Sequence, residues 1–587
     1  MSKTLLVLLV ACACRDDGRG STAHGVGSLP ATGRLTAAQG DLANTRYSPL
    51  AQITTGNVGQ LKISWTYDTG SAKGHEGAPL VDPQGGTIYV VTPFPNKLVA
   101  LDMTGKEKWE ATVPQNPMAE GRACCDVVNH GAALGNGVVY FATLDAQLVA
   151  VDAANGSVKW TTSLGDADLG ETTTAQPAVI GDQVLIGVSG ELFGKRGKLV
   201  AVDAATGAKQ WTAYSTGPDA DVKIGARFHP YYEQDRGSEL GTRSWPSDAW
   251  ERGGGDVSGF LAYDPALGLV YHGTGAPAPW NQDQRPGDNK WTSGVFARDA
   301  RTGDAVWFYP YTSHARYPYD GTGETVLVDL QGRPLLVHPD ANGYIYVLDR
   351  KTGQVLSADP FVNVTESDHV ELATGRLVEN EEKQPLPGQV VRDVCPAAAG
   401  AKNWQPSAFS PDTGLLYIPH ETMCMDFEAM PVGFVAQTPY IGALVKMYDA
   451  PDAGGTLGAL TAWDPLKRRA VWSVAEQFPV WSGALATAGG LVFYGTMDGD
   501  FRAVDAKTGR RLWSQHLPSG IVGQPVTFQS NGRQYVAVYS GVGGWAGSII
   551  TNGLDPKDVT AGRGFVDAMK ELPKKTEAHG RLYVFAL

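Results

Sequence analysis

One pattern of apolar and polar positions returns along most of the chain. A run with alternating apolar positions, such as GVVYFATLDAQLVAVD, leads into a Thr-Gly or Asn-Gly turn and then into a short segment that ends in tryptophan. Apolar positions with a period of two predict half-buried β-strands, and the glycines predict tight turns between them. The repeat lacks the 3.6-residue apolar period of an amphipathic helix. The pattern therefore predicts an all-β protein made of repeated sheets.

The repeated phrase has eight units, and seven of them end in tryptophan. These residues are Trp65, Trp109, Trp160, Trp211, Trp307, Trp472 and Trp513, and Ser357 takes the same place in VLDRKTGQVLS. One unit of this length matches a four-stranded blade, so the sequence predicts an eight-bladed β-propeller with tryptophan-docking repeats. We expect the tryptophan rings to pack between neighbouring blades.

Two intervals of the repeat are long, and they place insertions at about residues 212–255 and within 358–460. Loops of this length in a compact domain are usually functional or cover a site, so we expect them to cover the axial cavity. The last residues, GRLYVFAL, have strand character. We expect them to pair with the N-terminal segment, which would close one propeller over residues 38–587.

The chain begins with a segment that is typical of export. Residues 1–14, MSKTLLVLLVACAC, combine a lysine, a short apolar stretch and small residues, as a signal peptide does. LVAC resembles a lipobox, which predicts a lipid anchor at Cys12 and a periplasmic or otherwise exported protein. An ordinary or misassigned start is the alternative. The polar, glycine-rich residues 15–37 are expected to act as a flexible linker.

Composition narrows the classes of partner and cofactor. The chain has 587 residues, of which 43% are hydrophobic, and its net charge of −13 is opposite in sign to a nucleic-acid-binding surface. No apolar run reaches the roughly 20 residues of a membrane span. Outside the leader there are four cysteines, Cys124, Cys125, Cys395 and Cys424, and an even number in an exported chain predicts two disulfides. The absence of a CxxCH motif excludes covalently bound haem c.

Several long phrases resemble one known family. They are DLANTRYSPLAQITTGNVGQLKISW, HEGAPLV, RACCDVVN, APAPWNQDQRPGDNKW, KNWQPSAFSPDTGLLYIP and WSGALATAGGLVFYGTMDGDFRAVDAKTG. With the tryptophan repeat, they resemble the quinoprotein alcohol dehydrogenases, the family of methanol dehydrogenase. That resemblance implies an eight-bladed propeller that binds pyrroloquinoline quinone (PQQ) and a metal ion on its axis. It also implies a small alcohol as substrate and a soluble cytochrome c as electron acceptor.

The resemblance assigns site residues by position. It implies a disulfide between the adjacent Cys124 and Cys125, which packs on the quinone, and a structural disulfide between Cys395 and Cys424. The positions that match hydrogen-bonding partners of the quinone are Glu76, Thr174, Ser189, Gly190 and Asn403. Those that match the walls of the cavity are Trp404, Trp481 and Trp545.

The sequence departs from the family where the chemistry takes place. Glu191 stands one position before the expected metal ligand, where Leu192 is found, and in a strand such a shift would turn the carboxylate to the other face. The other replaced positions are Ala276 for a metal-binding Asn, Ser258 for the stacking Trp, Asp256 for a Thr, Pro318 for the catalytic Asp, and His130 and Ala341 for two Arg. Asp320 matches the additional carboxylate of lanthanide-using members.

Three functions remain open at this point. The first is alcohol oxidation with PQQ and a calcium or lanthanide ion, in which Asp320 or Glu191 supplies the carboxylate and His130 the base. The second is a propeller without PQQ and metal that binds a ligand or a protein. The third is another metal-dependent activity, with His130, Glu191, Asp256 and Asp320 as nitrogen and oxygen ligands for Ca, Mn or Zn. Fold resemblance cannot decide between them because function depends on the site.

Overall fold

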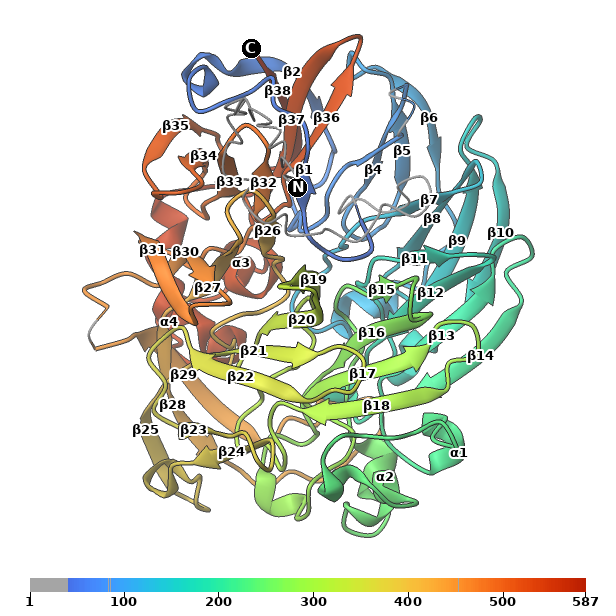
Figure 1. Ribbon diagram of the computed structural model, residues 1–587, viewed down its shortest axis with the longest axis vertical. Helices are drawn as coiled ribbons and strands as arrows, with labels where there is room; N and C mark the ends of the chain where they lie inside the picture. The colour runs from blue at the N-terminus through green and yellow to red at the C-terminus, as the bar shows by residue number, and fades with distance from the viewer. Residues whose placement is uncertain (1–40, 83, 85, 452) are drawn as a thin grey trace, which may run out of the picture.

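The computed structural model describes residues 41–587 except 83, 85 and 452. The predicted leader 1–14, the linker 15–37 and Cys12 lie outside these residues. Eight sheets stand around a common axis, seven with four strands and one with a fifth (Figure 1). The prediction of an eight-bladed β-propeller is confirmed.

The blades follow one another along the chain. From the inner to the outer strand, the first four are β3 (Leu80–Val81), β4 (Ile88–Val91), β5 (Leu98–Leu101), β6 (Glu107–Ala111); β7 (Ala133–Gly135), β8 (Val138–Thr143), β9 (Gln147–Asp152), β10 (Val158–Ser163); β11 (Ala178–Ile180), β12 (Gln183–Val188), β13 (Lys198–Asp203), β14 (Lys209–Tyr214); and β15 (Ala262–Asp264), β16 (Leu269–Thr274), β17 (Gly294–Asp299), β18 (Ala305–Pro310). The next three are β19 (Val326–Leu330), β20 (Arg333–Pro339), β21 (Tyr344–Asp349), β22 (Val355–Pro360); β26 (Ala408–Ser410), β27 (Leu415–Glu421), β30 (Gly458–Asp464), β31 (Arg469–Glu476); and β32 (Leu485–Thr487), β33 (Leu491–Gly495), β34 (Asp500–Asp505), β35 (Arg511–His516).

The last blade joins the two ends of the described chain. It consists of β36 (Val526–Ser530), β37 (Arg533–Ser540), β38 (Arg581–Ala586) and β2 (Lys62–Asp68). β2 pairs antiparallel with β38, and Trp65 lies opposite Val584. The predicted closure of the ring by the C-terminal strand is therefore confirmed.

The repeated phrase has a direct packing reason. At Gly353 the backbone has φ = 76°, and a Cβ atom there would lie 2.7 Å from Cε3 of Trp307, which belongs to the preceding blade. The same contact recurs in the pairs Gly105 and Trp65, Gly156 and Trp109, Gly207 and Trp160, Gly303 and Trp211, and Gly509 and Trp472. Only glycine combines a left-handed turn with room for the ring. This confirms that the tryptophans pack between blades.

The segment at residues 41–48 crosses one end of the propeller axis. Its carbonyl groups accept hydrogen bonds from the first strands of four blades, in the pairs Leu42 and Tyr263, Ala43 and Leu327, Thr45 and Phe409, and Arg46 and Ala486. Within it, β1 (Tyr47–Ser48) adds the fifth strand to the blade that begins with β32. The segment thus ties together blades that are far apart in the sequence.

The two insertions have different places. In the first, α1 (Asp219–Val222) and α2 (Leu240–Arg243) lie at the outer edge of the ring (Figure 1), where His229 donates to Val306 of β18. The expectation that this insertion covers the axis is wrong for these helices, because their apolar side chains pack on the outer strand instead.

The second insertion covers the axis, as expected. It contains the hairpin β23 (Ser367–Glu371) and β24 (Arg376–Glu379) and the sheet of β25 (Val390–Val394), β28 (Met423–Ala429) and β29 (Ala443–Asp449). This sheet, α3 (Gly544–Thr551) and α4 (Phe565–Met569) share one apolar cluster with Trp404 and Trp481. No helix in the described ranges is long and apolar enough to cross a membrane.

Candidate functional site

The axial site is an internal space lined by polar residues. Asp256 and Asp320 are half-buried, and burial raises the pKa of both carboxyl groups. The other half-buried residues among those singled out from the sequence are Cys124, Cys125, Thr174, Ser189, Ser258 and Asn403. They come from loops of separate blades, which meet only because the ring brings them to one axis.

Glu76 and His130 form a buried pair beside two tryptophans. Oε1 of Glu76 accepts from Nε1 of Trp481 at 2.9 Å, and Oε2 lies 3.2 Å from Nε2 of His130. The His130 ring stacks on Trp404 with 4.8 Å between centroids, and its Nδ1 has no partner. Burial raises the pKa of Glu76, and the bond from His130 opposes that shift. Both carboxylate oxygens of Glu76 are thus engaged by the protein itself.

The two predicted catalytic residues have different hydrogen-bond partners. His130 is 3% exposed and bonded to Glu76, whereas Oδ1 of Asp320 accepts from the backbone N–H of Ala276 at 2.6 Å. Within the described chain no hydrogen bond or ion pair joins His130 to Asp320. Burial raises the pKa of Asp320 to about 6.

Glu191 reaches the axis by a different route from the expected one. It lies in the 3-10 turn Glu191–Phe193, is 6% exposed, and its Oε1 accepts from Nε1 of Trp280 at 2.8 Å. The expectation that the one-residue shift turns this carboxylate away is wrong, because the segment is a turn and not a strand. Leu192 instead packs in the apolar cluster formed with the sheet of β25, β28 and β29 and with α3 and α4.

Asp256 links the carboxylates electrostatically. Its Oδ1 accepts from the N–H groups of Gly190 and Glu191 at 2.8 and 3.0 Å. Burial raises its pKa to about 7, and the charge of Asp320 adds to that shift. Burial together with the charges of Asp320 and Asp256 holds the pKa of Glu191 well above its usual value. Burial and mutual repulsion therefore make it unfavourable for all three carboxyl groups to be ionised at the same time.

Arg563 is a site residue that sequence reasoning missed. Its Nη1 lies 3.6 Å from Sγ of Cys124 and 3.9 Å from Sγ of Cys125, and the charge of Glu191 supports its protonated form against burial. It has φ = 53° between two glycines. The Gly-Arg-Gly triplet was the one available signal, but it gives no reason to expect the side chain at the axis.

Several of the remaining predicted site residues already form hydrogen bonds with the protein itself. The Thr174 carbonyl accepts from the His130 N–H at 3.0 Å, while the buried Oγ of Ser189 has no partner. Asn403 donates to the Ala399 carbonyl and accepts from the Trp404 N–H, both at 2.9 Å. The two disulfides, Cys124 to Cys125 and Cys395 to Cys424, are present in the structure.

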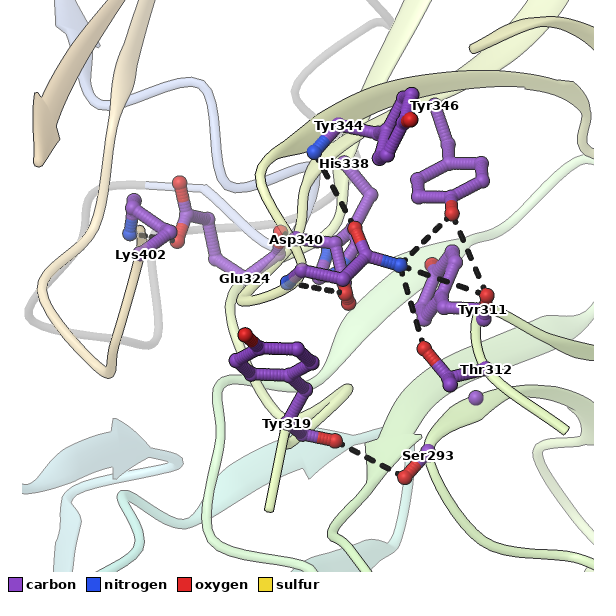
Figure 2. A network of polar contacts seen from close by, with 12 residues as sticks. Ser293, Tyr311, Thr312, Tyr319, Glu324, His338, Asp340, Tyr344, Tyr346 and Lys402 are labelled. Carbon is purple, nitrogen blue, oxygen red and sulfur yellow. Dashed lines mark hydrogen bonds and ion pairs between the residues drawn. The ribbon is translucent and has the colours of Figure 1, made fainter. Parts of the chain in front are cut away.

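A small space beside Asp320 is backed by a buried polar network. A space of about 10 Å³ lies between Asp320, Ala341 and Asn403, which is room for about one water molecule. Behind it, Lys402 pairs with Glu324 at 2.8 Å and His338 with Asp340 at 3.0 Å, as Figure 2 shows. All four of these side chains are fully buried, so this wall is structural.

These features define an eight-bladed propeller with polar residues on its axis, and comparison with known proteins shows its family. The family model for the β-propeller domain of PQQ glucose/ethanol/alcohol dehydrogenases matches residues 36–372 and 455–536. The chain is 48% identical over 557 residues to a lanthanide-dependent methanol dehydrogenase of Methylacidiphilum fumariolicum (strain SolV), covering 93% of this chain and 91% of that protein.

Two further matches support the same conclusion. Methanol dehydrogenase (cytochrome c) subunit 1 of Methylorubrum extorquens is 41% identical, with 93% of this chain and 89% of that protein covered. The solved structure of a europium-containing methanol dehydrogenase superposes with a TM-score of 0.92 at 47% identity, covering 94% of this chain and 98% of that chain. The chain therefore belongs to the PQQ-dependent dehydrogenase family and is alcohol dehydrogenase-like.

The residues at the axis do not fit PQQ as the family holds it. PQQ carries three carboxylates, and burying it requires opposing charges and donors. Here His130 is bonded to Glu76, Ala341 carries no charge, and the charge of Arg563 interacts with that of Glu191. Among the residues the structure describes, no three His, Cys, Asp or Glu side chains are grouped so that they could hold a metal ion by themselves.

Proposed function

We propose that this protein is an alcohol dehydrogenase-like propeller that binds a small molecule in its axial cavity without the quinone and metal chemistry of its family. One observation carries the proposal: Glu191, Asp256 and Asp320 lie so close that the charges of both aspartates raise the pKa of Glu191 and the charge of Asp320 raises that of Asp256. Such a cavity repels a polyanion and favours a neutral or positively charged ligand.

The walls of the cavity support a ligand of that class. Nε1 of Trp280 binds Glu191, and Trp404 and Trp545 are 9% and 7% exposed beside the same apolar cluster. Aromatic walls with a few polar groups are typical of small-molecule sites, and aromatic faces also attract cations. The ligand we propose is therefore a small alcohol or amine and not PQQ.

Titration of the purified protein with PQQ tests the proposal. We expect no saturable heat and no absorption change at micromolar PQQ, with or without calcium or lanthanum. We also expect small alcohols or amines at millimolar concentration to raise the melting temperature. Stoichiometric binding of PQQ would contradict the proposal directly.

A second function is supported by one specific observation. Thr174, Ser189, Cys124 and Cys125 are all half-buried, the two cysteines form a disulfide, and the Ser189 hydroxyl lacks a partner that a bound ligand could supply. The second proposal is alcohol oxidation with PQQ and electron transfer to a cytochrome c, which the printed name of one relative mentions.

An activity assay separates the two proposals. Methanol or ethanol is added with PQQ, lanthanum and an artificial electron acceptor, and dye reduction is followed. Binding without redox chemistry predicts no alcohol-dependent rate. Turnover on the order of 10 per second, lost in Asp320→Asn, would favour the second proposal.

We also propose that the protein works outside the cytoplasm. The two disulfides support this location, since oxidising compartments preserve such bonds. Fractionation of the native host and the mass of the mature N-terminus test it, and a lipid-modified Cys12 would establish the anchor. Full-length protein in the cytoplasm would refute it.

A further inference from the structure

A cleft at the outer edge of the ring shares no residue with the axial site. It has a volume of about 890 Å³ and lies between the first insertion, which contains α1 and α2, and the turn at Lys351 and Thr352 of the next blade (Figure 1). Val306 of β18 also lines it. Clefts of several hundred cubic ångströms have the size that small organic molecules occupy.

Much of the cleft wall is apolar and partly aromatic. Ile224, Phe228 and Val306 are half-buried, and Tyr231 is 42% exposed. The Phe228 ring packs edge-on against Trp291 with 5.3 Å between centroids, which holds it in place. These side chains form a surface on which the flat apolar body of a ligand can pack.

Two basic side chains at the cleft are available to a ligand. The Arg236 guanidinium donates to the carbonyls of Pro230 and Tyr231 at 3.1 and 2.7 Å, which fixes its place. In the described chain the only acid paired with it is Glu233, at 4.0 Å from Nη1 and 92% exposed, so solvent weakens that pair. Lys351 is exposed and forms no ion pair with any described residue.

The acidic residue Asp219 also lines the cleft, but the protein already encloses its carboxylate. Oδ2 accepts from the Glu239 N–H at 2.8 Å, and Oδ1 is buried without a partner. With histidine neutral, Arg236 and Lys351 against Asp219 leave the cleft a charge of +1, whereas the whole chain carries −13. The cleft is thus a locally basic site on an acidic protein.

A third cation lies close to the apolar wall. Arg298 is fully buried, its Nη1 donates to the Val222 carbonyl at 2.7 Å, and its guanidinium lies 3.9 Å from the centroid of the Phe296 ring. Phe296 and Phe228 belong to the same apolar cluster. Among the described residues Arg298 forms no ion pair, so its charge adds to the positive potential at the cleft.

We propose that this cleft binds a small aromatic anion, such as an aromatic carboxylate or sulfonate. The rings pack on the apolar wall beside Phe228 and Tyr231, and the acidic group accepts hydrogen bonds from Lys351 and from Nη1 of Arg236. A neutral aromatic molecule would leave both cations unpaired, and an inorganic anion would leave the apolar wall in contact with water. The proposal is independent of the axial ligand, because the two sites have no residue in common.

A pair of matched probes tests the chemical class of the ligand. Anilinonaphthalene sulfonate has aromatic rings and a sulfonate, whereas phenylnaphthylamine has the same rings without the charge. In calorimetric titrations we expect saturable binding of one sulfonate per chain and about tenfold weaker binding of the amine, since a hydrogen bond to a charged group adds 1 to 3 kcal/mol or so. No saturable binding of the sulfonate, or equal affinity for both probes, would overturn the proposal.

Two glycine variants test the location of the bound probe. Gly225 lines the cleft, and nothing lies within 4 Å of its Cβ position, so Gly225→Trp fills the cleft without displacing a neighbour. We expect this variant to lose binding of the sulfonate. Gly59→Trp is the control, because Gly59 is exposed, has an equally free Cβ position and lies outside the cleft. If Gly225→Trp binds like the parent protein, the probe binds elsewhere and the proposal fails.

Variants of Lys351 test the contribution of the charge. We expect Lys351→Gln to weaken binding of the sulfonate about tenfold and Lys351→Arg to retain it. Lys507→Gln is the control, because Lys507 takes the same turn position in another blade: the N–H groups of Lys351 and Lys507 donate to Asp349 and Asp505 at 2.9 and 3.0 Å. Equal affinities of Lys351→Gln and Lys507→Gln would contradict recognition of an anion at this cleft.

Discussion

At the scale of the residue, the surroundings of Asp256 act on its ionised carboxylate in two opposite ways. Two backbone N–H groups bind its Oδ1, which favours the carboxylate, but burial outweighs them and raises its pKa to about 7. The neighbouring Asp320 is shifted in the same direction, to about 6. Around neutral pH this cavity therefore changes its charge, which affects both stability and ligand choice.

A pH dependence of stability follows from these shifts. The folded protein keeps protons that the unfolded chain loses near pH 4, so raising the pH from about 4 to about 7 favours unfolding. We expect urea unfolding at pH 4.5, 6 and 8 to show a falling free energy. Asp256→Asn should flatten this trend and be more stable than the parent at pH 8, by on the order of 1 kcal/mol.

The exposed Asp368 supplies the matched control for that experiment. Asp368→Asn removes one charge of the same sign from the surface, so we expect it to keep the slope of the parent protein. An unchanged slope in Asp256→Asn would show that the axial carboxylates do not retain their protons in the folded state.

Restoring the replaced positions should restore cofactor binding. We expect the triple variant Ser258→Trp, Asp256→Thr and Ala341→Arg to bind PQQ at least about tenfold more tightly than any of the single variants. The three positions act on one ligand and are not additive. Calorimetry measures the affinities. If the parent protein binds PQQ tightly and the triple variant binds it no better, the PQQ site was never lost. That result would support the second proposal, alcohol oxidation with PQQ.

At the scale of the element, the contact between a turn glycine and a tryptophan is the unit that joins blades. Trp307 is fully buried against Gly353, and Asp349 holds the same turn by accepting from the N–H groups of Lys351 and Thr352 at 2.9 and 3.2 Å. The aspartate sets the turn, and the turn places the glycine under the ring. The repeated sequence phrase thus specifies both the hairpin within a blade and the contact between neighbouring blades.

Substitution of Gly353 tests this contact. Gly353→Ala should destabilise the protein by more than about 1 kcal/mol, because its Cβ meets the Trp307 ring and its backbone has a positive φ. Gly332→Ala in the same blade is the control: its φ is 74°, and nothing lies within 4 Å of its Cβ position. Chemical unfolding compares the two, and equal losses would mean that the ring contact contributes nothing beyond backbone strain.

At the scale of the whole molecule, one blade is completed by both ends of the described chain. β38 lies between β37 and β2, and Val584 and Phe585 are fully buried in it. Without this strand two edges of backbone would be left open and the ring would have no closure. The stability of every blade therefore depends on a strand of six residues.

Truncation tests the closure. Removing residues 581–587 should abolish the cooperative thermal transition and give aggregates on size-exclusion chromatography, because β2 loses its partner. Removing Leu587 alone, which is 41% exposed and follows β38, should leave both properties unchanged. A monomeric, cooperatively folded truncation product would show that the ring does not need this strand.

The sequence by itself determined the architecture of this protein. Blade number, interblade tryptophans such as Trp307 and the closing strand could all be predicted, because each depends on a local pattern that repeats or on strand character. The sequence also predicts that site residues are replaced at positions such as Pro318 and Ala341, since these stand in phrases that otherwise resemble the family.

Only the tertiary structure decided what the axial cavity contains. Glu191 stays at the axis because its segment forms a turn, and His130 is occupied because the ring brings Glu76 against it. Arg563 reaches Cys124 across a separation of 439 residues. Spacing in the sequence reports on periodic backbone structure, whereas the charge and chemistry of this cavity depend on side chains from separate blades that meet only when the ring closes.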